Sequence, residues 1–223
     1  TADGNDRNIA IGTSALYTAG ASSNVAADNV AIGHQALTLA TTADYNVAIG
    51  FGSQATQTTG GQNVAIGYQS HGGDNDGTDS TAVGHKALLR LVGSTKNVAI
   101  GHQAMSLMNG TADGLANCVA IGADAFKGDA TNTTTGANGT VAIGKSALAA
   151  LTAGAANVAV GFEALLIEDA GGRNTAIGYQ ALKACNNDTG VNTALGWTAG
   201  DAITDGYANT LIGSGSGTTN SND

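Results

Sequence analysis

A short phrase, Asn-Val-Ala-Ile-Gly, recurs along the whole chain with small variations, and it constrains the fold more than any other feature. Its glycine occurs twelve times; successive glycines are 17 residues apart in seven of the eleven intervals and 18 to 22 apart in the other four. The twelve are Gly12, Gly33, Gly50, Gly67, Gly84, Gly101, Gly122, Gly144, Gly161, Gly178, Gly196 and Gly213. A period of this length predicts an all-β chain folded as a parallel β-solenoid of about twelve coils, in which each coil is buried by its neighbours.

Each phrase is predicted to form a short strand, because β-branched residues stand two apart, as Val30 and Ile32 do around Ala31. Alternation along a strand places Val30 and Ile32 on one face and Ala31 on the other. Both faces are apolar, as in strands that are buried on both sides. A thin solenoid wall turns only one face to its own interior. We therefore expect the other face to meet a partner, most simply another copy of the same chain.

The glycine and the asparagine of the phrase indicate special backbone roles. A glycine at all twelve positions predicts either a turn with positive φ or a close contact between chains. Asparagine opens nine of the phrases, and Ser80, Cys118 and Thr140 take its place in the others. The nine are Asn8, Asn29, Asn46, Asn63, Asn97, Asn157, Asn174, Asn192 and Asn209. In aligned coils we expect these amides to form a hydrogen-bonded ladder or to support the turn into the strand.

A second apolar column lies four residues after the glycine and predicts the other side of each coil. Its large members are Leu16, Leu37, Leu88, Met105, Phe126, Leu148, Leu165 and Leu182. Gln54, His71, Gly200 and Gly217 interrupt it, so we expect weaker packing in two middle coils and in the last two. The extra residues of the longer intervals, such as 106–117 and 127–138, follow this column. They are expected to project from one side and to leave the stacked core undisturbed.

The composition excludes several classes of partner. A formal charge of −9 without a basic tract argues against nucleic acids and anionic membranes. No stretch approaches the ~20 apolar residues that a membrane-spanning helix needs, so no membrane insertion is expected. Only 4% of the residues are aromatic, so burial must come from many small side chains. We assign residues 1–217 to one repeat domain and 218–223 to a polar tail.

The phrase Asn-Val-Ala-Ile-Gly resembles the head repeats of trimeric autotransporter adhesins, and the longer form NTAIGYQAL at residues 174–182 resembles repeats of phage tail fibres and related bacterial surface fibres. The resemblance extends from Asn8 to Gly213. It implies a left-handed β-roll, three of which pack around a common axis as a homotrimer. It also implies an extracellular location, on a cell surface or a virion. The implied function is that of a structural or adhesive fibre that binds a host receptor or glycan. A self-assembling building block of an extracellular filament, stacked end to end, is the alternative.

The residue after the glycine is often aromatic or histidine, and it forms a candidate interchain or ligand column. Its members are His34, Phe51, Tyr68, His85, His102, Phe162, Tyr179 and Trp197. Regular spacing makes stacking on neighbours available to each, so we expect packing along the chain or in an interchain seam. Contact with a ligand such as a glycan is the alternative. Three chains could also gather the histidines around an axis into a metal or anion site.

Residues 72–79 carry oxygen ligands at alternate positions, as calcium loops do. Asp74, Asp76 and Asp79 are the candidate ligands, and a solvated turn without an ion is the alternative. The bidentate glutamate that completes calcium loops does not follow.

No motif predicts catalysis or a cofactor. Residues 139–146 match the phosphate-loop pattern, and residues 50–55 imitate a dinucleotide fingerprint, but both are variants of the repeat strand and its turn. Glutamate occurs only at Glu163 and Glu168, which leaves little for paired-carboxylate chemistry. Cys118 and Cys185 lie in distant coils and are expected to be free thiols. We therefore predict that the chain is not an enzyme.

Overall fold

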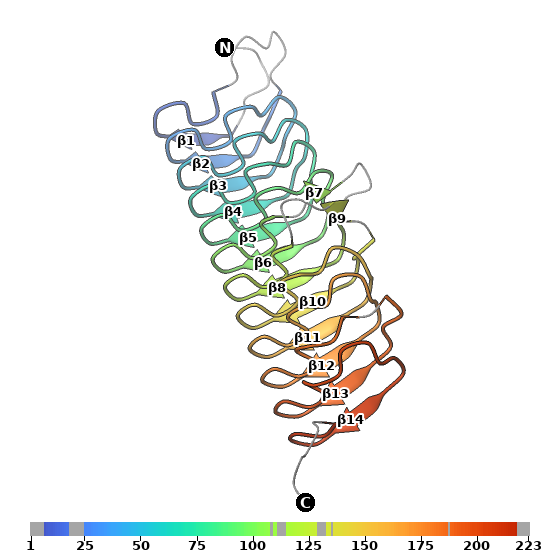
Figure 1. The fold of residues 1–223 in the computed structure, drawn as a ribbon. Coiled ribbons are helices and arrows are strands. Elements are labelled where there is room, and N and C mark those ends of the chain that lie inside the picture. Colours follow the sequence, from blue (N-terminus) through green and yellow to red (C-terminus); the bar gives the residue numbers. More distant parts are fainter. Residues whose placement is uncertain are drawn as a thin grey trace, which may run out of the picture.

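The computed structural model describes residues 7–17, 25–107, 109–110, 115–128, 133–134, 136–186 and 188–217. Twelve three-residue strands stack in chain order into one parallel sheet, which runs along the solenoid in Figure 1. They are β1 (Ile9–Ile11), β2 (Val30–Ile32), β3 (Val47–Ile49), β4 (Val64–Ile66), β5 (Thr81–Val83), β6 (Val98–Ile100), β8 (Val119–Ile121), β10 (Val141–Ile143), β11 (Val158–Val160), β12 (Thr175–Ile177), β13 (Thr193–Leu195) and β14 (Thr210–Ile212). The predicted all-β parallel solenoid is confirmed, and the described residues contain no helix.

The register between neighbouring strands is constant from end to end. Each valine, alanine and isoleucine pairs with its equivalent in the next coil, as Ala31 does with Ala48. The pairing of β6 with β8 and of β8 with β10 keeps this register across the two longest consecutive intervals. Within these two insertions, β7 (Asn109–Gly110) and β9 (Thr133–Thr134) pair with each other in a separate two-stranded parallel sheet. The insertions therefore leave the main stack intact, as the repeat predicted.

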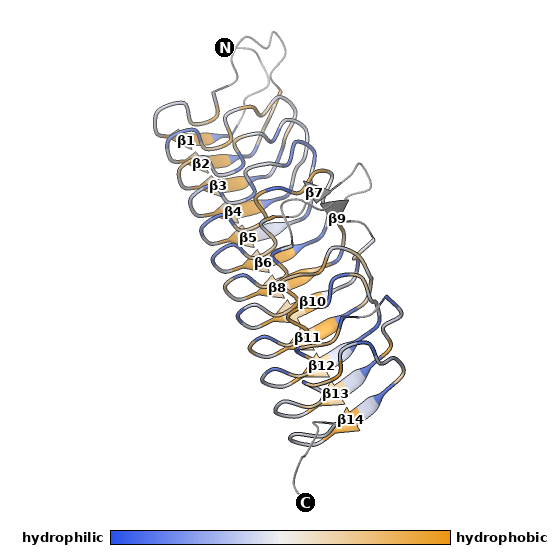
Figure 2. Cartoon of the chain, viewed as in Figure 1, coloured by the Kyte–Doolittle hydropathy of each residue, from blue (hydrophilic) through white to orange (hydrophobic). Residues whose placement is uncertain are grey.

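The alternation of each strand determines which side faces the interior. The central alanine points into the coil and is fully buried, as at Ala31, Ala99 and Ala159. The flanking valine and isoleucine point outward and stay partly exposed. Figure 2 shows these strands as a mostly orange ladder along the solenoid, paler where threonine replaces valine. Small residues thus fill the thin interior, while the larger apolar ones lie on the outside.

The glycine that ends each strand is required for two reasons. Gly33 has φ of 134°, a conformation that L side chains rarely adopt. In addition, a Cβ added to Gly33 would lie 2.5 Å from the carbonyl oxygen of Gly50 in the next coil. The positive φ expected from the sequence is present, and the close contact joins successive coils of one chain.

Three further positions in each coil are left-handed, and in most coils none of the three is glycine. In the second coil they are Asp28, Gln35 and Leu37, with φ of 59°, 58° and 49°. Such residues cost about 1 kcal/mol each, so the coil depends on hydrogen bonds that offset this strain. The backbone N–H of Leu37 donates to the carbonyl of Ser53 at 2.9 Å, and that of Gln35 to the carbonyl of Thr13 at 3.0 Å. Successive coils are therefore bonded along the turn as well as along the strand.

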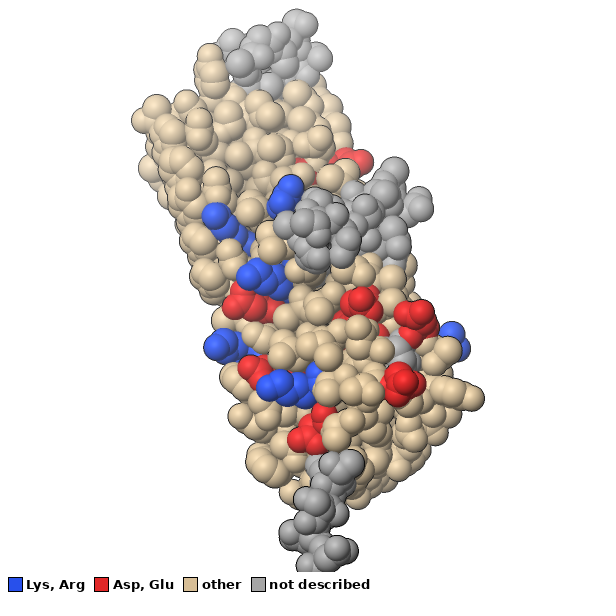
Figure 3. Space-filling view, viewed as in Figure 1, with Lys and Arg blue, Asp and Glu red and all other residues tan. Residues whose placement is uncertain are grey.

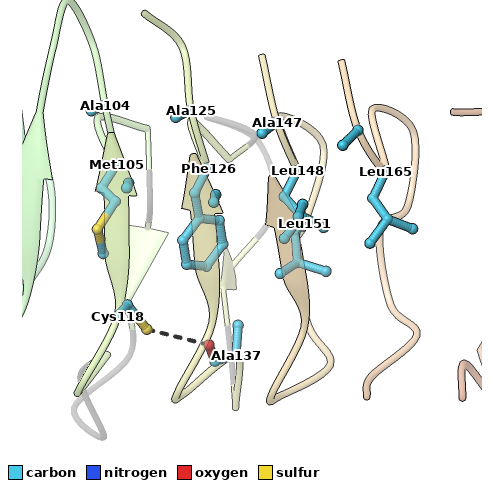
Figure 4. Close-up of a cluster of buried hydrophobic side chains, with 14 of the residues drawn as sticks. Ala104, Met105, Cys118, Ala125, Phe126, Ala137, Ala147, Leu148, Leu151 and Leu165 are labelled. Atoms are coloured by element: carbon cyan, nitrogen blue, oxygen red, sulfur yellow. Dashed lines mark hydrogen bonds between the residues drawn. The ribbon is translucent and has the colours of Figure 1, made fainter. Parts of the chain in front are cut away.

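The interior of most coils is filled by alanine and leucine. We call the coils that follow Gly84 and Gly144 the leucine coils; their interior residues are Ala87, Leu88, Leu91, Ala147, Leu148 and Leu151. All six side chains are fully buried. Figure 4 shows the same arrangement continuing through Met105, Phe126 and Leu165, one large side chain in each coil.

Two consecutive coils break this pattern. We call the coils that follow Gly50 and Gly67 the polar coils; their interior residues are Ser53, Gln54, Gln57, Ser70, His71 and Asp74, all fully buried. They separate a small N-terminal hydrophobic cluster, which ends at Ala48, from a larger one that begins at Ala82. The weaker apolar packing expected at Gln54 and His71 is thus present as a break between two hydrophobic clusters.

The last coils are packed by different residues from the others. Gly200 and Gly217 lack the large side chain of their column, and Leu211, which replaces the usual strand alanine in β14, lies beside both glycines. A Cβ added to Gly200 would lie 2.9 Å from Leu182 and 3.1 Å from Leu211. Leu211 thus takes up space that two small residues leave, although it stays partly exposed.

Candidate functional site

The outward side chains of the strands form a continuous surface, which we call the outer strand face. It comprises the first and third residues of the twelve strands, none of which is charged. At the strand spacing of about 4.8 Å it extends over roughly 50 Å. Ile66, Ile100 and Ile121 retain 39%, 38% and 36% of their exposure in the single chain. Uncharged apolar surface of this extent is typical of an interaction surface.

The aromatic column lies directly after the strand and forms two stacked ladders. In the first, His34, Phe51, Tyr68, His85 and His102 follow one another with ring centroids 5.0 to 5.3 Å apart. In the second, Phe162 stacks on Tyr179 at 5.2 Å, and Tyr179 on Trp197 at 6.2 Å. Ala123 and Lys145 separate the two ladders.

Stacking along the column leaves few ring faces open to a ligand. Each inner ring of a ladder has a neighbour on both sides, so solvent meets mainly its edge. Lys145 covers the free end of the second ladder, with Nζ 5.7 Å from the centroid of Phe162. Trp197, at the other end, is 60% exposed. The rings pack on their neighbours within the chain, and a threefold histidine site stays a prediction because it needs partner chains.

The asparagines that open the phrases form a ladder inside the coil. The backbone N–H of Asn46 donates to Oδ1 of Asn29 at 2.9 Å, and that of Asn63 donates to Oδ1 of Asn46 at 3.0 Å. Most of the amide nitrogens donate in turn to a backbone carbonyl, as Nδ2 of Asn29 does to Ala43 at 2.8 Å, whereas Nδ2 of Asn174 is buried without a partner in the described structure. The amides thus form a hydrogen-bonded ladder between adjacent coils and also support the turn into the strand. Both roles expected from the sequence are present.

Cys118 takes the asparagine position in one coil. Its N–H still takes part in the ladder by donating to Oδ1 of Asn97 at 2.9 Å, and its Sγ donates to the carbonyl of Ala137 at 3.4 Å, drawn in Figure 4. Burial raises the pKa of this thiol above its ordinary value. Cys185 is buried elsewhere in the core, and neither cysteine forms a disulfide.

The cation loop expected at Asp74, Asp76 and Asp79 is not formed, and this interpretation is corrected. Asp76 and Asp79 point to solvent, whereas Asp74 is fully buried. The Oδ1 atom of Asp74 accepts backbone N–H groups from Gly77 and Gly93, both at 3.0 Å, so these donors occupy it. No group of three potential ligands suited to a metal lies within the described residues.

Asp74 is instead a structural carboxylate inside a polar coil. Its Oδ2 accepts from the hydroxyl of Ser94 and lies 3.4 Å from Nε2 of His71. Burial raises the pKa of Asp74, but hydrogen bonds from His71 and Ser94 outweigh burial and hold that pKa below its ordinary value. Glu168 stands at the same point of a later coil, seven residues after the glycine, and its Oε1 accepts the N–H of Gly171 at 2.6 Å. A buried acidic residue in this column, where Leu91 and Leu151 stand in other coils, was not predicted from the sequence.

A shallow groove of about 210 Å³ crosses the corner before β3 and β4, on coils that include the polar ones. We call it the Gly61 groove, after the glycine at its centre. Its other lining residues are Thr42, Asp44, Tyr45, Thr59, Gln62 and Thr78. It was not predicted from the sequence, because its walls come from positions up to 36 residues apart that only the stacking of coils brings together.

Residues 139–146, which matched a phosphate loop, contain strand β10 and the turn after it, as their place in the repeat indicated. In the part of the chain that the structure describes, no helix is long and apolar enough to cross a membrane. No family model, curated protein or solved structure matches the chain. Its function must therefore be argued from its surfaces.

Proposed function

We propose that the chain is a segment of a trimeric fibre, in which three copies pack their outer strand faces around a common axis. The observation that carries the proposal is the outer strand face itself. It is apolar, uncharged and as long as the stack of coils, whereas the interior of the coil is already filled by alanine and leucine. Exposure of isoleucine along a whole sheet is costly in water, and burial against like faces removes that cost.

A closed assembly of three parallel chains would bury the outer strand face more completely than an assembly that leaves part of this face in solvent. The register between strands is constant, so the apolar columns run in parallel lines along the solenoid. Parallel rods with one apolar face each can close that face completely around a threefold axis. The resemblance of the repeats to adhesin heads and tail-fibre repeats supports the same number. The proposed location of the chain is extracellular, on a virion or a cell surface. Its proposed role is structural and adhesive rather than catalytic.

The outer strand face can be tested by adding a charge to it. In Ile100→Glu, three carboxylates would meet near the axis, and we expect the trimer to dissociate into folded monomers, because the side chain points out of the coil. Ile167→Glu is the matched control, since Ile167 is similarly exposed, at 43% against 38%, but lies outside the strands. Sedimentation velocity would report the mass, and circular dichroism the fold.

Equal masses for the two variants would contradict the proposed interface. A monomer for Ile100→Glu with a trimer for Ile167→Glu would support it.

End-to-end assembly into a filament is the second candidate. β1 and β14 each pair with only one strand of the main sheet, so each has a backbone edge that a further strand could join. Ile11 and Ile212 at these ends are also the most exposed isoleucines of the outer face, at 58% and 68%. Electron microscopy of the concentrated chain separates the candidates: rods that lengthen with concentration favour the filament, and rods of fixed length favour the trimer alone.

A further inference from the structure

The Gly61 groove differs in chemistry from the two surfaces described above. It is lined by polar side chains and one tyrosine, and it spans three successive coils. Thr42, Asp44 and Tyr45 come from the first of these coils, Thr59, Gly61 and Gln62 from the second, and Thr78 from the third. Hydroxyl, amide and carboxylate groups thus lie beside an aromatic ring, a lining more polar than that of pockets for drug-sized ligands.

We propose that the Gly61 groove binds one unit of an uncharged saccharide. The proposal rests on the proposed function, since it names the ligand that the fibre surface would recognise. A volume of about 210 Å³ is below that of pockets for drug-sized ligands, so the groove fits a single ring rather than an extended ligand.

The polar groups of the groove have free hydrogen-bonding capacity. Within the described structure, the hydroxyls of Thr42 and Thr59 and the side chain of Gln62 make no hydrogen bond to the protein. Asp44 uses Oδ1 to accept the N–H of Ala27 at 2.7 Å, which fixes the carboxylate and leaves Oδ2 available. The groove therefore offers both donors and acceptors, as the hydroxyl groups around a sugar ring require.

Tyr45 supplies an apolar surface that the aromatic column does not. Its side chain is 59% exposed, and among the described residues it stacks on no other ring. A tyrosine combines a flat apolar body with a polar hydroxyl, which suits the C–H face and the hydroxyl rim of a sugar. The rings of the column are covered on their faces by their neighbours. Tyr45 is thus the better placed aromatic for this ligand.

The charges around the groove decide between neutral and acidic saccharides. Residues 8–85 contain no lysine or arginine, while Asp44 lines the groove and Asp76 and Asp79 lie in the next coil. Figure 3 shows the charged residues gathered over the middle and C-terminal coils of the drawn face rather than over the N-terminal coils. An acidic sugar would meet Asp44 in the groove, and none of the residues that line the groove is a cation, so the site favours an uncharged sugar.

The test uses saturation-transfer difference NMR on the whole chain. The probes are the methyl glycosides of glucose, galactose, mannose and N-acetylglucosamine, with sialic acid as the acidic comparison. We expect at least one neutral glycoside to bind and sialic acid to give no signal. Tyr45→Ala should weaken binding about tenfold or more. Tyr207→Ala is the matched control, because Tyr207 is also exposed, at 67%, but lies outside the groove.

Binding that is unchanged in Tyr45→Ala, absence of any neutral ligand from the panel, or a preference for sialic acid would overturn the proposal. The solution mass of the same samples separates this result from the fibre: a trimer that binds no saccharide refutes the groove alone, and a monomer that binds one refutes the trimer alone.

Discussion

The polar coils and the leucine coils follow the same backbone path with opposite fillings. The N–H of Gln54 donates to the carbonyl of Ser70 at 3.0 Å, and the N–H of Leu88 donates to Ala104 at 2.9 Å, so the bonds between coils are the same in both. In the polar coils, however, Gln54 Oε1, Gln57 Oε1 and His71 Nδ1 are buried without a hydrogen-bond partner in the described structure. The strand, the glycine and the asparagine ladder thus determine the backbone path of the coil. The interior side chains determine how much each coil contributes to stability.

The largest effect on stability is expected when a polar side chain replaces an interior leucine of a leucine coil. Leu148→Gln puts into a leucine coil the residue type that Gln54 places in a polar coil. We expect a loss of about 3–5 kcal/mol in the free energy of unfolding, because apolar burial is lost and an amide is left without partners. Urea unfolding followed by circular dichroism measures it. A loss under about 1 kcal/mol would mean that any coil accepts either filling.

Asp74 offsets part of the cost of the polar interior by accepting hydrogen bonds from buried N–H groups, so removing it should lower the stability of the fold. Asp74→Ala leaves the N–H groups of Gly77 and Gly93 without their acceptor, and we expect a loss of about 2–4 kcal/mol. Asp76→Ala is the matched control: Asp76 is exposed in the same turn, and its replacement should change stability by less than about 0.5 kcal/mol. Similar losses for both variants would show that Asp74 has no special role. The same urea titration serves for both.

The contribution of Asp74 also has a predicted pH dependence. Its folded pKa lies below the ordinary value of 3.8, so the unfolded chain takes up the proton first as the pH falls. The stabilisation is complete above that value and is lost as the pH falls through the folded pKa. The stability difference between the unmodified chain and Asp74→Ala should therefore be constant near neutral pH and shrink below about pH 4. A difference that grows in acid would contradict the sign of this shift.

The smallest effect is expected from filling the polar coils with leucine. Gln54→Leu combined with Gln57→Leu removes two unpaired oxygens, and we expect a gain of about 1 kcal/mol. The acceptors that lose a donor keep another one: Gly77 retains Nδ2 of Asn63 at 2.7 Å, and Asn46 retains the N–H of Asn63 at 3.0 Å. Thermal unfolding of the double variant beside the unmodified chain measures it. A destabilised double variant would mean that the amides are needed where they are.

The repeat made the fold predictable because one local pattern recurs in every coil. The strand positions, the turn at the glycine and the ladder position of the asparagine all follow from residues within a few positions of each other. The place of Asp74 could not be derived in this way, since an aspartate in a turn is ordinarily solvated and its burial depends on the neighbouring coil. Leu211 is a similar case, because its space is made by Gly200 and Gly217 on the other side of the coil.

The candidate surfaces were predictable to different degrees. Alternation in the strand predicted a second apolar face, and the regular column predicted stacked rings. The Gly61 groove combines residues from three coils, and only the stacked structure places Thr42, Tyr45 and Thr78 around one hollow. A tyrosine just before a ladder asparagine is the one sequence signal that singles out this corner.

The most direct test of the central claim, that the outer strand face packs against identical faces, is the mass of the purified chain in solution. Light scattering over a dilution series should give about 65 kDa, three times the 21.7 kDa of one chain, and the value should hold as the sample is diluted. A stable 21.7 kDa monomer at every concentration would contradict the trimeric fibre and leave a single-chain solenoid with an apolar face open to solvent.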